Sequence, residues 1–223
     1  MMDTRQLTGL LYSMGHTFDN LASTYMATAE FLSTNNPEII GSRSDLALLQ
    51  DLRDAASYTL HEPLATPLDV DFVRGINAEL SRTAAIEPGK LRESANIMVH
   101  TASGAYIPPV PDATAMGDVI GAAMEGDDPM RDAARLFAHL AKMQPFGDGN
   151  KRTALLAANR LLMLRGVDRA MVVPTEDPAK GTFNTMLGEW YVHDAPAVID
   201  WLAGYNREIS GVDDLGHAVP VRQ

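Results

Sequence analysis

The segment from Lys151 to Arg165 constrains the fold of this chain more than any other part of the sequence, because it is apolar around most of a helical circumference. A helix that is apolar on all sides is buried on all sides, and such a helix lies in the middle of a bundle. The sequence therefore predicts an all-α protein built around this helix. Its apolar positions are Ala154, Leu155, Leu156, Ala157, Ala158, Leu161 and Leu162.

Amphipathic helices are predicted on both sides of this central helix. Over the segment 1–34, apolar residues recur at three- and four-residue steps, which predicts one helix that Asn35-Asn36-Pro37 ends. A helix with Ser44 as its N-cap follows over 44–58, and another over 67–80 has Pro67 in its first turn. Further helices are expected over 112–124, 129–143, 183–191 and 196–205.

One segment breaks the helical pattern. Two short β-like runs, 97–101 and 105–109, surround Ser103-Gly104, and the prolines that follow end the second run. The sequence therefore predicts a small hairpin over 97–107, the only strand pair that its pattern supports. The residues after 206 are expected to form a loose tail.

Composition narrows the function classes. The 223 residues carry a net charge of -11, and a nucleic-acid partner would require a basic face, so none is expected. The absence of cysteine excludes disulfides, thiolate metal sites and a cysteine nucleophile. No apolar stretch reaches the roughly 18 residues of a membrane span, and the polar start does not resemble a signal peptide. We therefore expect no membrane association and a cytoplasmic location.

A glycine-bearing loop joins the predicted helix 129–143 to the central helix. It ends in the free backbone N–H groups and positive dipole end of a helix start, which attract anions. Lys151 and Arg152 would oppose the helix dipole unless an anion lies between them and the backbone. Asp148 is suited to a magnesium ion shared with phosphate oxygens. The alternative is a plain joint between two helices, with Asn150 as N-cap; the loop is not a Walker A motif.

The run Gln144-Pro145-Phe146-Gly147-Asp148-Gly149-Asn150-Lys151-Arg152 resembles the signature of the Fic/Doc family, His-x-Phe-x-Asp/Glu-Gly-Asn-Gly/Lys-Arg. All of its positions except the first are compatible. The residues 148–155 are similar to the Doc-like branch, and 88–92 and 106–109 resemble the family's flap region. The resemblance spans 67–205, which implies a helical extension over 1–66, a Fic core over 67–205 and a tail over 206–223.

The resemblance implies a helical bundle with a short β-hairpin flap, using ATP or another nucleotide with Mg²⁺. Family members transfer AMP, or in the Doc-like branch a phosphoryl group, to a hydroxyl of a target protein. Asp148 would hold the metal, and the flap would dock the protein substrate by strand addition. The implied nucleotide-binding residues are Phe146, Gly147, Gly149, Asn150, Lys151 and Arg152, with Phe146 also anchoring the loop. The implied flap residues are Ile97, Met98, Val99, His100, Tyr106 and Ile107.

Two departures from the family pattern affect the expected activity. Gln144 replaces the histidine that takes the proton from the target hydroxyl, and an amide cannot accept a proton at useful pH. Leu155 replaces an arginine that many AMP-transferring members have and Doc-like members lack. Neither His139, expected to be a packing or surface residue, nor His100 is expected to substitute for the base.

Three functions therefore stay open. The first is a Fic-type transferase that is slow, altered or assisted by another base, with Gln144 and Arg152 at the catalytic positions. The second is a catalytically silent Fic-fold protein that binds nucleotide and a partner, as a regulator or a toxin–antitoxin-like module. The third is an enzyme that uses the same loop for another phosphorylated substrate such as phosphocholine. A homodimer is also open.

Overall fold

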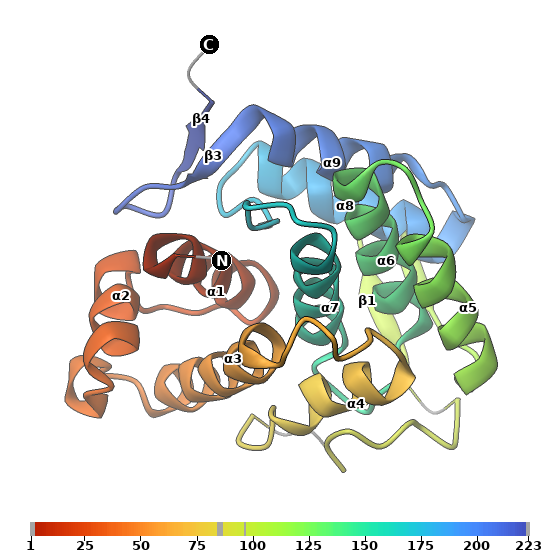
Figure 1. The fold of residues 1–223 in the computed structure, drawn as a ribbon, viewed down its shortest axis with the longest axis horizontal. Coiled ribbons are helices and arrows are strands. Elements are labelled where there is room, and N and C mark those ends of the chain that lie inside the picture. Colours follow the sequence, from red (N-terminus) through yellow and green to blue (C-terminus); the bar gives the residue numbers. More distant parts are fainter. Residues whose placement is uncertain (1–2, 84–86, 96, 222–223) are drawn as a thin grey trace.

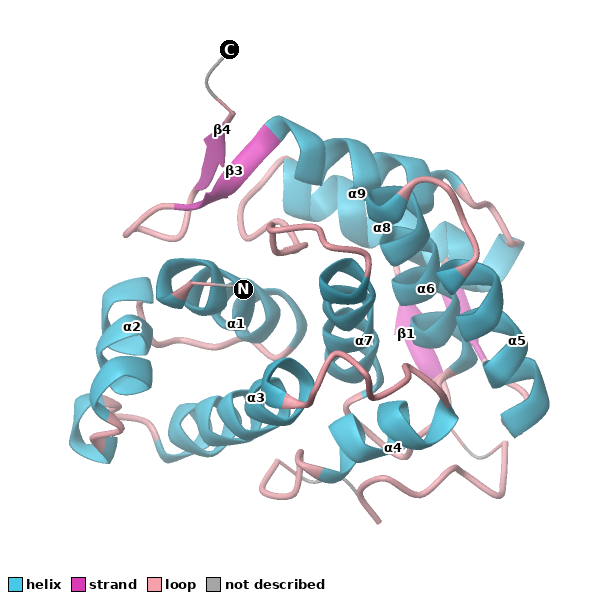
Figure 2. Ribbon diagram, in the orientation of Figure 1, coloured by secondary structure: helices cyan, strands magenta, loops and turns pink. Residues whose placement is uncertain are grey.

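The computed structural model describes residues 3–83, 87–95 and 97–221. Helices surround α7 (Asn150–Leu164), which stands in the middle of the molecule (Figure 1). It packs against α1, α3, α4 and α6. Every residue from Arg152 to Leu162 is buried, as the sequence predicted for a helix inside a bundle. Figure 2 shows that helices dominate, and the strands among the described residues pair as β1 with β2 and β3 with β4.

The elements have the following bounds in the structure. The helices are α1 (Thr4–Phe18), α2 (Tyr25–Thr34), η1 (Pro37–Ile39), α3 (Arg43–His61), α4 (Val70–Ala78), α5 (Ala113–Met124), α6 (Pro129–Met143), α7 (Asn150–Leu164), α8 (Ala179–His193) and α9 (Ala197–Glu208). The strands are β1 (Val99–Thr101), β2 (Gly104–Tyr106), β3 (Ile209–Val212) and β4 (Ala218–Pro220).

The predicted single helix over 1–34 is wrong, because the chain turns between α1 and α2. Asn20 adopts a left-handed conformation at φ 55°, and Thr24 then caps α2 by accepting a hydrogen bond from the Ala27 N–H. The Asp45 carboxylate accepts two bonds from Ser23, one from its N–H and one from its hydroxyl, each at 2.7 Å. Apolar spacing continues across the turn, so periodicity alone could not reveal the break.

Two predicted helix starts are also displaced. The N-cap of α3 is Ser42 rather than Ser44, because the Ser42 hydroxyl accepts from the Asp45 N–H. Similarly, α4 begins after Asp69, whose carboxylate accepts from the Phe72 N–H at 2.8 Å, so Pro67 lies before the helix. In both cases the side chain that reaches the N3 amide decides where the helix begins.

The flap hairpin lies where the sequence predicted it. β1 and β2 pair antiparallel, with Val99 opposite Tyr106 and Thr101 opposite Gly104. The hairpin packs on α8 through a contact between the rings of Tyr106 and Tyr191, whose centroids are 5.6 Å apart. This contact fixes the hairpin at one edge of the bundle.

The residues after 206 do not form a loose tail, because β3 and β4 pair into a second hairpin that the sequence analysis missed. Its turn is held by Asp213, whose carboxylate accepts from the N–H groups of Leu215 and His217. The buried Val212 lies against Gly9 of α1, where a Cβ would come within 2.9 Å of its side chain. The contact with α1 thus fastens the second hairpin to the bundle.

Candidate functional site

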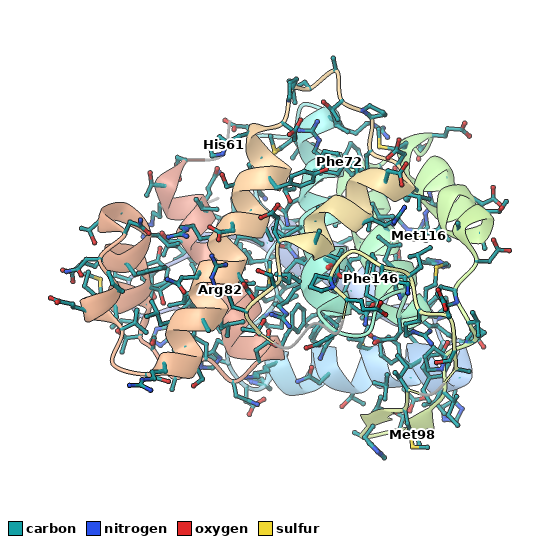
Figure 3. All side chains as sticks on the ribbon, turned by 90° about the horizontal axis from the view of Figure 1, so that it is seen from below. His61, Phe72, Arg82, Met98, Met116 and Phe146 are labelled. Carbon is teal, nitrogen blue, oxygen red and sulfur yellow. The ribbon has the colours of Figure 1, made fainter. Side chains whose placement is uncertain are left out.

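The loop between α6 and α7 is braced from within by Asn150. Its side-chain oxygen accepts from the Phe146 N–H at 2.8 Å, and its amide donates to the Phe146 carbonyl at 2.9 Å. The Phe146 ring is buried in the core, as expected for an anchor (Figure 3). Asn150 therefore holds the shape of the loop. The plain-joint alternative, in which Asn150 is the N-cap of α7, is wrong on this point.

The cap position of α7 is Gly149, and no side chain caps the helix there. Gly149 has a φ of 73°, which favours glycine, and an added Cβ would lie 2.5 Å from the Leu80 side chain. Asn77 holds the same turn by donating to the Asp148 carbonyl at 3.0 Å. Because no side chain among the described residues takes the first N–H groups of α7, they stay available to an anion.

Gln144 ends α6 in a left-handed conformation at φ 47°, and its side chain is hydrogen-bonded at both ends. The amide nitrogen donates to the Ala141 carbonyl at 2.7 Å, and the amide oxygen accepts from Asn150 at 3.0 Å. Arg92 donates to the Gln144 backbone carbonyl at 2.7 Å. The side chain at the position of the family's base is thus fixed rather than free.

Arg152 is the buried cation of the site, with 3% of its side chain exposed. Its Nη1 donates to the Thr83 hydroxyl at 2.7 Å, and its other nitrogens lie 3.6 Å from the Asp19 carboxylate and 3.5 Å from the Asp148 carboxylate. The neighbouring Lys151 places its ammonium group 5.0 Å from the centre of the Phe18 ring. Burial lowers the pKa of Lys151, and the Asp19 carboxylate opposes that shift.

These side chains line one cavity of about 510 Å³, within the range of small-molecule sites. Two acidic and two basic side chains face it, together with the first residues of the flap. The lining comprises Phe18, Asp19, Ile97, Met98, Val99, Gln144, Gly147, Asp148, Gly149, Asn150, Lys151 and Arg152. A groove of larger volume, about 820 Å³, runs between α4 and α5, but Arg74 is the only cation among the described residues of its lining, so it suits phosphate less.

The flap residues named from the sequence divide into two groups. Residues 97–99 line the cavity, and Met98 stands exposed on the hairpin (Figure 3). Tyr106 instead packs on Tyr191, and the Lys142 ammonium group lies 5.6 Å from the centre of the Tyr106 ring. His100 and Ile107 are exposed and do not line the cavity.

Sequence reasoning missed four side chains that hold this site: Asp19, Asn77, Thr83 and Arg92. Each of them is far along the chain from the loop residue that it contacts, so no local pattern relates the two. His139, by contrast, packs edge-on against Trp190, with ring centroids 4.9 Å apart, and burial lowers its pKa. It belongs to the packing between α6 and α8.

The buried carboxyl of Asp19 lowers the stability of the folded protein, and the size of this effect depends on pH. Its Oδ2 is buried without a hydrogen-bond partner in the described part of the chain, and burial raises the pKa of the carboxyl despite the nearby Arg152. A raised folded pKa means that the folded state binds the proton more tightly than the unfolded state. Stability therefore falls as pH rises from about 3.9, the unfolded value, through the folded pKa, and the cost persists at neutral pH.

We therefore expect Asp19→Asn to stabilise the fold at pH 7, by about 1 kcal/mol for one unsatisfied buried oxygen. Thermal unfolding of both proteins at pH 7 and pH 4 measures the difference, which should shrink at the lower pH. Asp118→Asn, a change of the same kind at an exposed position, serves as control. A destabilised Asp19→Asn protein at pH 7 would mean that attraction to Arg152 outweighs the cost of burial.

Comparison with known proteins identifies the domain that contains this site. Residues 67–162 match the model of the Fic/DOC family. The match includes the whole loop from Gln144 to Arg152. None of the curated proteins is similar in sequence to the chain.

Solved structures show the same fold. A Fic-domain-containing signalling protein from Bacteroides thetaiotaomicron aligns at a TM-score of 0.73 with 21% identity, over 89% of this chain and 81% of the other. IbpAFic2 covalently tethered to Cdc42 aligns at 0.57 with 18% identity, over 91% of this chain and 62% of the other. BepC from Bartonella tribocorum with bound AMPPNP aligns at 0.50 with 16% identity, over 79% and 86%.

The expected fold, a Fic-type all-α bundle with a short hairpin, is therefore confirmed. Among the described residues, no helix is long and apolar enough to cross a membrane. The division into an extension over 1–66 and a core over 67–205 stays a prediction. Side chains from α1, α2 and α3 nevertheless share one buried cluster with those of the core.

Proposed function

We propose that this chain binds a magnesium–nucleotide complex at the 146–152 loop and is related in activity to transferases that move AMP or phosphate onto a protein hydroxyl. One observation carries the proposal. The uncapped start of α7, the buried Arg152 and the carboxylate of Asp148 line a single cavity together with the first residues of the flap. BepC, which shares the fold, holds AMPPNP, an analogue of ATP.

The residues present fit a magnesium ion that arrives with phosphate. Asp148 is about half exposed and lines the cavity, and magnesium in nucleotide sites commonly uses one or two carboxylates with phosphate oxygens and water. Among the described residues, no group of three or more acidic or histidine side chains could hold a metal ion. We therefore assign Asp148 as the protein's ligand and expect the bound ion to neutralise phosphate charge.

For AMP transfer, the oxygen of the target hydroxyl would bond to the α-phosphorus of ATP while the bond from that phosphorus to pyrophosphate breaks. For the Doc-like reaction, the γ-phosphoryl group would move and ADP would leave. Arg152 and the N–H groups of α7 would stabilise the phosphate charge in both cases. The hydroxyl proton has no acceptor at position 144, so it would pass to water, and transfer would be slow or altered.

The flap suits an extended target segment. β1 and β2 form a two-stranded sheet, so neither strand has a second partner among the described strands. Residues 97–99, where β1 begins, also line the cavity. A segment that pairs with the outer edge of β1 would therefore bring its side chains to the phosphate loop, in the manner of strand addition.

A second candidate function is a catalytically silent protein that binds nucleotide and a partner. The fixed amide of Gln144 favours it, because hydrogen bonds to Ala141 and Asn150 occupy both ends of the side chain. A protein with this role would still bind nucleotide, but it would transfer neither AMP nor a phosphoryl group to any target protein.

Titration calorimetry with Mg·ATP tests the binding that both candidates require. We expect the wild-type protein to bind and Arg152→Ala to bind at least about tenfold more weakly, because a charge-assisted phosphate contact is worth about 1.5–3 kcal/mol. Arg169→Ala removes a partly buried arginine whose partners are the backbone carbonyls of Asn206 and Arg207, so it is the matched control.

Equal binding of Mg·ATP by the wild-type protein and by Arg152→Ala would mean that the 146–152 loop is not part of the nucleotide-binding site. If the wild-type protein binds neither ATP nor ADP, with or without magnesium, nucleotide binding at this loop is wrong.

A further inference from the structure

The side chain of Asp51, on α3, is fully buried and accepts hydrogen bonds from the segment that follows α4. Its carboxylate accepts from the Arg82 N–H at 3.1 Å and from the Thr83 N–H at 2.8 Å. The Arg82 guanidinium, labelled in Figure 3, donates to the same carboxylate at 3.1 Å. The Thr83 hydroxyl lies 2.7 Å from the same carboxylate. Asp51 therefore fixes both the backbone and the hydroxyl of Thr83.

The direction of the next hydrogen bond follows from the chemistry of its atoms. The guanidinium of Arg152 can only donate, so the Thr83 oxygen accepts from it at 2.7 Å. The single hydroxyl proton of Thr83 is then directed to the Asp51 carboxylate. The three side chains form a chain from carboxylate to hydroxyl to guanidinium, in which each bond strengthens the next.

Among the contacts of Arg152 within the described residues, only the one to Thr83 is short enough to set an orientation. The carboxylates of Asp19 and Asp148 lie 3.6 and 3.5 Å away, beyond ordinary hydrogen-bond length, so they attract the guanidinium without fixing its plane. The position of Arg152 toward the phosphate loop therefore depends on Thr83.

We propose that Asp51 and Thr83 are positioning residues that hold the Arg152 guanidinium in the geometry that phosphate binding needs. The proposal rests on the proposed function for its ligand. It assigns part of the site to α3, which precedes the matched residues 67–162. The helices before residue 67 would then be required for ligand affinity as well as for packing.

Thr83→Val tests this proposal because it keeps the shape of the side chain and removes the hydroxyl. Thr83→Ser, which keeps the hydroxyl, is the conservative rescue. Thr59→Val is the control for any loss of stability, because it also removes a threonine hydroxyl. Thr59 is a buried residue of α3 whose hydroxyl donates to the Ala55 carbonyl. We expect about tenfold weaker Mg·ATP binding for Thr83→Val, with Thr83→Ser and Thr59→Val close to wild type.

A second measurement needs no ligand. The Nη–H signal of Arg152 in ¹⁵N NMR spectra, assigned by its loss in Arg152→Lys, should exchange with water several-fold faster in Thr83→Val and stay slow in Thr59→Val, because Nη1 is the nitrogen that donates to the Thr83 hydroxyl. Faster exchange together with weaker binding supports the proposal. Unchanged exchange, or unchanged affinity for a ligand that Arg152→Ala loses, overturns it. Absence of binding by the wild-type protein instead overturns the proposed function, and is seen before any variant is compared.

Discussion

Gln144→His should raise the rate of transfer from ATP to protein by about 10²–10⁴-fold, which is the rate enhancement that a general base usually contributes. The backbone at this position is left-handed, at φ 47°, and histidine tolerates that conformation better than most residues. The Ala141 carbonyl, which now accepts from the Gln144 amide, could accept one ring N–H. The other ring nitrogen would then be free to take the hydroxyl proton.

ATP labelled with ³²P at the α- or the γ-position distinguishes the two possible reactions when labelled protein is measured in a cell extract. Label from the α-position indicates AMP transfer, and label from the γ-position alone indicates phosphoryl transfer. The double variant Gln144→His/Arg152→Ala should lose the gain. If Gln144→His binds Mg·ATP as the wild type does but transfers neither label, the missing base is not what limits the reaction.

The positions of the central helix and of the phosphate loop could be predicted from the sequence because both are local signals. The apolar residues between Ala154 and Leu162 require burial on most sides of a helix, and the two glycines before them mark a turn. The hairpin over 97–107 could also be predicted, because its two β-like runs and the turn between them are adjacent in the sequence. These patterns lie within one or two neighbouring elements.

The contacts that hold Arg152 could not be predicted, because they connect distant parts of the chain. Asp19 lies just after α1 and Thr83 just after α4, and nothing in the residues around either one indicates a guanidinium nearby. The segment 1–66 was expected to be an extension because the family resemblance begins at residue 67. In the structure, Asp19 from this part lines the candidate cavity, and Asp51 binds the segment that holds Arg152.

Caps and turns account for the remaining errors. The boundary between α1 and α2 depends on Asn20 and Thr24, and the second hairpin depends on a turn held by Asp213. Each is decided by one polar side chain that satisfies a backbone N–H, whereas apolar periodicity continues on both sides. A pattern that counts only apolar positions cannot locate these ends.

Arg160→Met should destabilise the fold by about 3 kcal/mol, the largest effect on stability that we expect from a single change. Arg160 lies on α7 with its side chain fully buried, and the Phe72 ring lies 4.9 Å from its guanidinium carbon. It donates to the carbonyls of Glu62, Pro63 and Thr66 at 2.6–3.0 Å. Without it, these carbonyls of the loop between α3 and α4 lose their donor.

Two opposing energies decide the result. Burial disfavours a cation that has no ion-pair partner among the described residues, and it lowers the pKa of Arg160, so removal of the charge recovers part of the loss. The hydrogen bonds to three carbonyls outweigh that recovery, because each charged bond contributes about 1.5–3 kcal/mol. Urea unfolding of Arg160→Met and of Arg169→Met compares a buried with a partly buried arginine, each bonded to backbone carbonyls. Equal stability of the two variants would mean that the cost of burying the charge cancels the hydrogen bonds, and that the α3–α4 loop is held by packing alone.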